Sequence, residues 1–63
     1  MPIANITIME GRDDEKKANL ITNVTDAIQE SLGAPRESIR VILNEVPKSH
    51  FGIAGKSGKE LGK

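Results

Sequence analysis

Residues 12–35, "RDDEKKANLITNVTDAIQESLGAP", contain a complete helix with its own start and stop signals. Asp13 is the expected N-cap, and Asp14 and Glu15 follow it in the first turn, where the helix dipole favours negative charge. Gly33 suits the position just after the last turn, and Pro35 prevents the helix from resuming. The apolar residues between these signals recur with helical spacing and predict one apolar stripe: Leu20, Ile21, Val24, Ala27, Ile28 and Leu32.

On each side of this helix the sequence predicts a β-strand. "PIANITIM" (Pro2–Met9) is rich in Ile and Thr and ends at the turn signal Glu10-Gly11. Pro2 fits the first position of a strand, where its missing N–H costs least. "SIRVILNEV" (Ser38–Val46) has a nearly continuous apolar centre, which is typical of a parallel strand buried on both faces. Strand, helix and strand together predict a βαβ unit with a right-handed crossover.

Residues 47–63, "PKSHFGIAGKSGKELGK", contain four glycines and are expected to be largely loop, with a short hairpin or strand in "HFGIAG". In this setting His50 is expected to be a turn or surface residue, and the lysines at 56, 59 and 63 are expected to be solvated. "GKSGK" lacks both the spacing of a phosphate-binding loop and a following helix. The expected fold is therefore α/β (α+β): a single domain over residues 1–63, a βαβ subunit with a short C-terminal hairpin.

A chain of 63 residues buries only about 60% of the surface that its unfolded form exposes. Small scaffolds usually need disulfides, a metal or partner subunits to become stable. The sequence has no Cys and one His, which argues against disulfides, thiolate metal sites and a His-based zinc site. Because one helix covers only one face of so small a sheet, a second copy is expected to add face packing, edge pairing or both.

The charges argue against two classes of partner. Nine basic and nine acidic residues give a formal net charge of +0, and no basic stripe indicates a nucleic acid. The apolar runs are far shorter than the ~20 residues that span a bilayer, so no membrane partner is expected. The N-terminus lacks the basic and apolar regions of a secretory signal, and the expected location is the cytoplasm.

Pro2 is a candidate catalytic base, provided that Met1 is removed. In a peptide bond its nitrogen has no proton and no basicity, whereas after removal of Met1 it becomes a secondary amine with a free lone pair. An exposed α-amine has a pKa near ~7.7–8.0, and a proline nitrogen is ordinarily more basic. Burial or nearby cations would have to lower the pKa for the amine to act as a base near neutral pH. The alternative is that Pro2 is only a rigid strand start.

Two arginines are candidates for binding an anion. Arg40 precedes "VIL" at the beginning of a strand expected to be buried, where an unpaired charge is costly and a carboxylate fits the guanidinium fork. Because parallel strands begin at the same edge of a sheet, Pro2 and Arg40 are expected to lie at the same edge. Arg12 follows the first strand, where a single arginine is most often a solvated loop charge.

The chain resembles the 4-oxalocrotonate tautomerase family along essentially its whole length. The resemblance rests on the order and spacing of five elements: Pro2-Ile3, the "EGR" that contains Arg12, the helix, Arg40 in "SIRVIL", and "HFGI". The resemblance implies a homohexamer, a trimer of dimers. It also implies conversion of 2-hydroxymuconate, an unsaturated six-carbon dicarboxylate of aromatic hydrocarbon catabolism, to 2-oxo-3-hexenedioate. The resemblance implies that Pro2 is the base, that Arg12 and Arg40 bind the two ends of the substrate, and that Phe51 lines the pocket.

The chemistry of proton transfer next to a carbonyl agrees with these residue types. It needs one base of near-neutral pKa that can return its proton as an acid. It also needs positive charge where the dienolate oxygen develops, which Arg40 can supply, while Arg12 can fix the distant carboxylate. Phe51 is expected next to the pocket, where it would lower the local dielectric and help to depress the pKa of Pro2. No metal or organic cofactor is required.

Two alternatives stay open at this point. One is a non-catalytic oligomeric interaction module, in which Pro2 caps a strand and the arginines pair with Glu10, Glu37 or Glu45. The other is a promiscuous tautomerase of other enols, such as phenylenolpyruvate. Dehalogenating relatives carry an acidic residue near the position of Ile53, and its apolar side chain argues against hydrolytic dehalogenation.

The length of the first strand predicts a site between subunits. From Pro2 to Met9 a strand spans ~23 Å, which is much longer than a six-carbon diacid. One chain's Pro2 and Arg12 therefore cannot both touch the substrate. If the first strands of two subunits run antiparallel across a two-fold axis, Arg12 of one chain lies beside Pro2 of the other.

Overall fold

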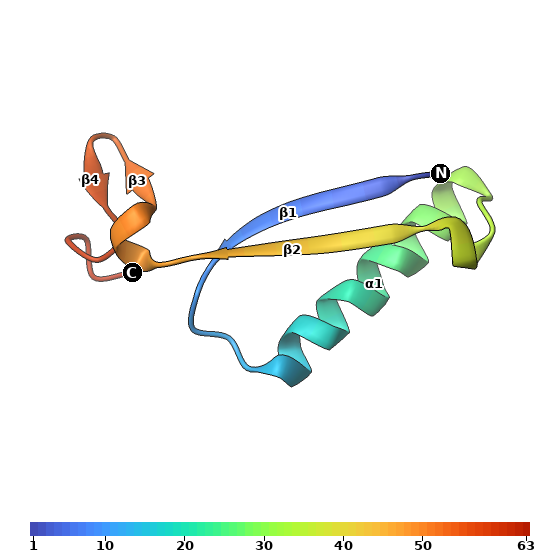
Figure 1. The fold of residues 1–63 in the computed structure, drawn as a ribbon, viewed down its shortest axis with the longest axis horizontal. Coiled ribbons are helices and arrows are strands. Elements are labelled where there is room, and N and C mark those ends of the chain that lie inside the picture. The colour runs from blue at the N-terminus through green and yellow to red at the C-terminus, as the bar shows by residue number, and fades with distance from the viewer.

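The computed structural model describes residues 1–63 and contains the predicted βαβ unit followed by a small hairpin (Figure 1). β1 (Ile3–Met9) and β2 (Arg40–Val46) lie side by side, and α1 (Asp14–Leu32) runs along one face of the pair. The hairpin of β3 (Gly52–Ile53) and β4 (Lys56–Ser57) lies beyond the end of β2. The α+β fold predicted from the sequence is confirmed.

Both ends of α1 follow the predicted capping signals. The Asp13 carboxylate accepts a hydrogen bond from the backbone N–H of Lys16 at 2.9 Å. At the other end Gly33 adopts a left-handed φ of 66°, and its N–H donates to the Gln29 carbonyl at 2.9 Å. A residue with a Cβ is strained in this conformation, so the glycine ends the helix where it does.

β2 begins later than the predicted Ser38, because residues Arg36–Ser38 form a 3₁₀ turn. The backbone N–H and the hydroxyl of Ser38 both donate to the Pro35 carbonyl, at 3.0 and 2.8 Å. These local bonds satisfy polar groups that a strand would have to pair across the sheet. The ladder with β1 therefore starts at Arg40.

The two strands are parallel, with Ile3 opposite Arg40 and Met9 opposite Val46. Side chains alternate between the faces of a strand, so residues that pair across the ladder share a face. The face toward α1, here called the covered face, carries Ala4, Ile6, Ile8, Val41, Leu43 and Glu45. The opposite face, here called the open face, carries Ile3, Asn5, Thr7, Arg40, Ile42 and Asn44, all of them exposed.

Two expectations of burial are not met within one chain. β2 was expected to be buried on both faces, yet Ile42 on the open face is 46% exposed. The apolar stripe of α1 is narrower than predicted, because Leu20, Val24 and Ile28 are half-buried while the other three members are exposed. The reason is geometric: one helix meets one face of a two-stranded sheet along one line of contact.

The single chain has almost no closed core. Only Ile39 and Gly58 are buried. The radius of gyration is 14.4 Å, whereas a compact chain of this length has a radius of about 11 Å. Exposed apolar side chains and an extended shape indicate a chain that buries its core against other chains. No helix has the length and apolar character needed to cross a membrane.

Candidate active site

Pro2 and Arg40 lie at the same edge of the sheet, as the parallel strands predict. The backbone N–H of Arg40 donates to the carbonyl of Pro2 at 3.0 Å, which extends the ladder by one residue beyond β1. Pro2 is half-buried, and Met1 before it is 77% exposed. A bond to the carbonyl leaves the nitrogen of Pro2 outside the ladder, so removing Met1 would not disturb this pairing.

The side chains of Pro2 and Arg40 nevertheless leave the sheet on opposite faces. Arg40 is opposite Ile3 on the open face, whereas Pro2 continues the alternation of Ala4 on the covered face. The Arg40 guanidinium turns back along its own chain, and its Nη1 donates to the Glu37 carbonyl at 2.6 Å. The expectation that Arg40 is buried is wrong for the single chain, because nothing in the chain covers the open face.

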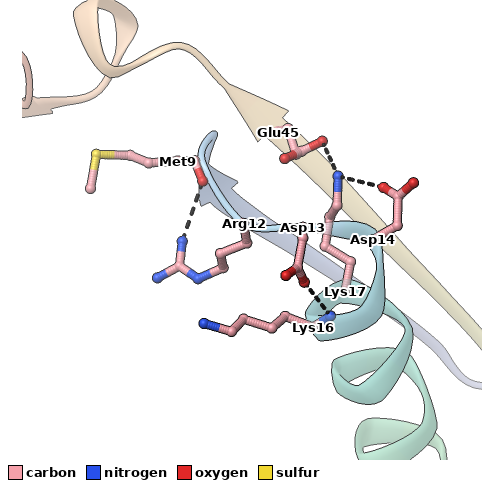
Figure 2. A network of polar contacts seen from close by, with 7 residues as sticks. All are labelled: Met9, Arg12, Asp13, Asp14, Lys16, Lys17 and Glu45. Carbon is pink, nitrogen blue, oxygen red and sulfur yellow. Dashed lines mark hydrogen bonds and ion pairs between the residues drawn. The ribbon is translucent and has the colours of Figure 1, made fainter.

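Arg12 lies at the other end of β1, in the loop that leads into α1 (Figure 2). It is exposed, and its Nη1 donates to the carbonyl of Met9 at 3.3 Å. Neither Arg12 nor Arg40 takes part in any of the four ion pairs of the chain. Both guanidinium groups therefore keep donors for an external anion.

The pairing required by the interaction-module alternative is not found. Glu45 bonds to Lys17 rather than to an arginine. Arg40 bonds to the main-chain carbonyl of Glu37 and not to its carboxylate.

Phe51 shares an end of the molecule with Arg12, not with Pro2. It follows a 3₁₀ turn (Lys48–His50) beyond the end of β2, and its carbonyl accepts from the Gly58 N–H at 2.7 Å. Gly58 approaches the end of β1 closely, since a Cβ there would lie 2.9 Å from the Met9 Sδ and 3.2 Å from the Lys48 carbonyl oxygen. Within one chain Phe51 and Pro2 therefore lie at opposite ends, and the predicted place of Phe51 next to the pocket requires a second chain.

His50 is a turn residue, as predicted. Its side chain is exposed, and its backbone N–H donates to the Pro47 carbonyl at 2.8 Å.

The first turn of α1 carries a polar network that the sequence interpretation missed (Figure 2). Lys17 Nζ contacts Glu45 Oε1 at 3.0 Å and Asp14 Oδ1 at 3.3 Å. The hydrogen bond to Glu45 is the main reason that the pKa of Lys17 is raised above 10.5. A signal was present in the sequence: the covered face of β2 alternates Val41, Leu43 and then a charged Glu45.

One chain thus carries two half-sites at opposite ends. One end holds Pro2, and the other holds Arg12 and Phe51. The single chain has no pocket that encloses a small molecule. A prospective amine base and an anion-binding group meet only if chains associate.

Comparison with known proteins connects this arrangement to a reaction class. A family described as tautomerase enzyme matches residues 2–60. The chain is 57% identical over 63 residues to 2-hydroxymuconate tautomerase of Stutzerimonas stutzeri, covering 100% of both chains. A solved structure of 4-oxalocrotonate tautomerase isozymes from Methylibium petroleiphilum aligns with a TM-score of 0.95 and 47% identity, over 98% of this chain and 100% of that one. A heterohexamer 4-oxalocrotonate tautomerase from Chloroflexus aurantiacus aligns with a TM-score of 0.92 and 36% identity, over 97% and 98% of the two chains.

Proposed function

This chain belongs to the tautomerase family, and on that premise we propose that it converts 2-hydroxymuconate to 2-oxo-3-hexenedioate. The chain is a tautomerase and hence an isomerase, so the enzyme interpretation stands over the non-catalytic module. The observation that carries the choice of substrate is the 57% identity, over the entire length, to a relative named for 2-hydroxymuconate.

The proposed reaction moves one proton and rearranges two double bonds. After removal of Met1, the Pro2 amine takes the proton of the C2 hydroxyl and delivers it to C5. The C2–O bond becomes a carbonyl, and the two carbon–carbon double bonds become one between C3 and C4. The amine ends in the protonation state in which it began, as general acid–base catalysis requires.

The two arginines divide the charges of the substrate between them. Negative charge develops on the C2 oxygen as its proton leaves, and we assign Arg40 to this oxygen because a guanidinium stabilises such charge most where water is excluded. We assign Arg12 to the distal carboxylate, which it can bind through two parallel hydrogen bonds. Both assignments are supported by the absence of a carboxylate partner for either arginine within the chain.

The complete site is proposed to be built from several chains. Pro2 and Arg12 occupy opposite ends of β1, so the Arg12 that serves a given Pro2 comes from another chain, and Phe51 accompanies it. Arg40 leaves the sheet on the open face, away from Pro2, so its guanidinium is also proposed to reach the Pro2 of another chain.

We propose that these chains form a hexamer, a trimer of dimers. β1 pairs only with β2, which leaves its other edge free for the β1 of a second chain. The open face exposes Ile3 and Ile42, which contact between dimers would bury.

An ultraviolet assay with 2-hydroxymuconate tests the function directly. The protein must be shown by intact mass to begin at Pro2, and Pro2→Ala serves as the matched control. We expect turnover by the wild type and a large loss in the control. A correctly processed, oligomeric protein that leaves 2-hydroxymuconate unchanged would overturn the proposal.

A further inference from the structure

Glu45 is a charged residue at a position where the sheet packs against a helix. On the covered face of β2 the preceding positions are Val41 and Leu43, both half-buried against α1. The Glu45 side chain is 37% exposed, and its carboxylate lies 3.0 Å from Nζ of Lys17, whose side chain is 22% exposed. A partly covered ion pair gives up hydration, which offsets much of what it contributes to stability and leaves room for a further role of this pair.

The pair ties together the two elements that flank the Arg12 loop. Lys17 is in the first turn of α1, and Glu45 is the penultimate residue of β2, 28 positions further along the chain. The short loop between β1 and α1 holds Arg12 (Figure 2). The start of that loop is anchored by the backbone N–H of Glu10, which donates to the Val46 carbonyl at 2.9 Å.

The end of the loop depends on the ion pair. Asp13 caps α1 through a local bond to Lys16, which orders the first turn but does not attach it to the sheet. The contact of Lys17 with Glu45 is the polar contact that attaches this turn to the sheet, in addition to the apolar packing further along α1. Arg12 itself has only a 3.3 Å bond to the nearby Met9 carbonyl, so its position follows the two anchors of its loop.

We propose that Lys17 and Glu45 are positioning residues that fix Arg12 for binding the distal carboxylate of the substrate. The assignment of the ligand rests on the proposed function, whereas the anchoring of the loop rests on the contacts alone. Neither side chain is assigned a contact with substrate, and both act through the loop that carries Arg12.

Removing the charge of Glu45 changes anion binding in opposite directions if the carboxylate positions the loop and if it acts only through its electrostatic field. Removing a negative charge near an anion-binding arginine should strengthen anion binding if only the field matters. Removing the Glu45 charge should weaken binding if the carboxylate holds the loop. Asp14 is a matched control because it also contacts Lys17, at 3.3 Å, but its side chain is fully exposed and it lies on the same helix.

The kinetic test compares Glu45→Gln with Asp14→Asn on two substrates, 2-hydroxymuconate and the monocarboxylate phenylenolpyruvate. We expect Glu45→Gln to raise KM for the dicarboxylate roughly five- to tenfold with kcat nearly unchanged, because a small displacement of a binding group is costly. KM for the monocarboxylate, which has no distal carboxylate, should not rise. Asp14→Asn should leave KM for the dicarboxylate unchanged or lower it.

A charge exchange between the two residues tests the same contact. Lys17→Glu/Glu45→Lys should bring KM for the dicarboxylate back from the raised value of Glu45→Gln toward the wild-type value. An unchanged or lowered KM in Glu45→Gln would overturn the proposal.

A second measurement keeps the inference testable without any substrate. In Glu45→Gln the protection of the Glu10 amide against hydrogen exchange should fall by about tenfold, because the loop opens locally. In Asp14→Asn the same amide should keep its protection. If the wild type does not turn over 2-hydroxymuconate, the proposed function fails while hydrogen exchange still tests the anchoring. If exchange at Glu10 is the same in the wild type and Glu45→Gln, the positioning role fails whatever the enzyme's substrate.

Discussion

Pro2 and Arg12 of one chain stand at the two ends of β1, separated by its seven residues, which is about 20 Å of extended strand. No six-carbon diacid spans that distance. The two residues of one chain therefore serve two different sites, and each site needs at least two chains. Because of this separation, oligomers mixed from two variants can test whether a site is shared between chains.

Mixing two impaired variants should restore activity, when it is measured with 2-hydroxymuconate well below the wild-type KM so that the raised KM of Arg12→Ala appears as lost activity. Pro2→Ala and Arg12→Ala subunits, unfolded and refolded together, should regain roughly a quarter of the wild-type activity by random assembly, since half of the sites keep Pro2 and half of those receive an intact Arg12. Native mass spectrometry would establish that hybrids have formed. Hybrids as inactive as their parents would contradict a site shared between chains.

The same experiment identifies the source of Arg40. We expect Pro2→Ala mixed with Arg40→Ala to recover activity as well, because the two side chains of one chain lie on opposite faces of the sheet. If this mixture stays inactive while the Arg12 mixture recovers, Pro2 uses the Arg40 of its own chain.

Retention of Met1 should abolish activity. The Pro2 nitrogen is an amide in the unprocessed chain, and its lone pair is delocalised into the Met1 carbonyl and cannot accept a proton. The exposed Met1 is accessible to an aminopeptidase. Intact mass and turnover, measured on the same preparations, should show activity proportional to the processed fraction. High activity in a fully unprocessed preparation would rule out Pro2 as the base.

Substitution of Arg40 and substitution of Arg12 should affect different kinetic constants. Arg40→Ala should lower kcat by about 10²–10³, as expected for loss of a donor to a developing oxyanion. Arg12→Ala should mainly raise KM, by roughly tenfold to a hundredfold, because its bond to a carboxylate is similar in the ground and transition states. Steady-state kinetics with 2-hydroxymuconate measure both effects, and the reverse pattern would mean that the two roles are exchanged.

A charge on the open face should prevent assembly. Ile42 is 46% exposed in the single chain, and burying that exposed part contributes about 1 kcal/mol at each copy of an interface. Ile42→Asp should therefore yield smaller species and lose activity, as measured by light scattering and turnover. Asn19→Asp, on the exposed side of α1, is the matched control and should stay oligomeric. An intact, active oligomer of Ile42→Asp would show that this face is free.

The contribution of Lys17 to stability should disappear at alkaline pH. Its pKa is raised mainly by the hydrogen bond to Glu45, so the stabilisation is fully present below 10.5 and is lost as pH rises through the higher pKa of the folded state. Thermal unfolding of wild type and Lys17→Met should therefore differ at neutral pH and converge above that range. A difference that persists unchanged would mean that Lys17 acts by packing rather than by charge.

Much of the secondary structure could be predicted because its determinants are local. Asp13 and Gly33 bound α1 through contacts within one helical turn, and Pro35 breaks the chain just beyond. Parallel pairing followed from the order strand, helix, strand and from the nearly continuous apolar centre of the second strand, and it correctly placed Pro2 and Arg40 at one edge. The candidate site residues Pro2, Arg12 and Arg40 could likewise be named from residue type and position alone.

The errors concern contacts that depend on register and on distant segments. β2 starts at Arg40 rather than Ser38 because a 3₁₀ turn competes with the ladder. Phe51 lies at the Arg12 end of its own chain because residues beyond β2 fold against the end of β1. Its predicted place next to the pocket stays a prediction, because it depends on how a second chain meets this one.

The sequence alone determined which residue types the chain offers and which segments become helix and strand, since capping and periodicity act over a few neighbouring positions. Only the tertiary structure determined which faces and ends those residues occupy. A shift of one residue along a strand moves a side chain to the opposite face, so the separation of Pro2 from Arg40 could not be inferred from the order of residues. The contact of Lys17 with Glu45 likewise exists only because the ladder brings the end of β2 beside the first turn of α1.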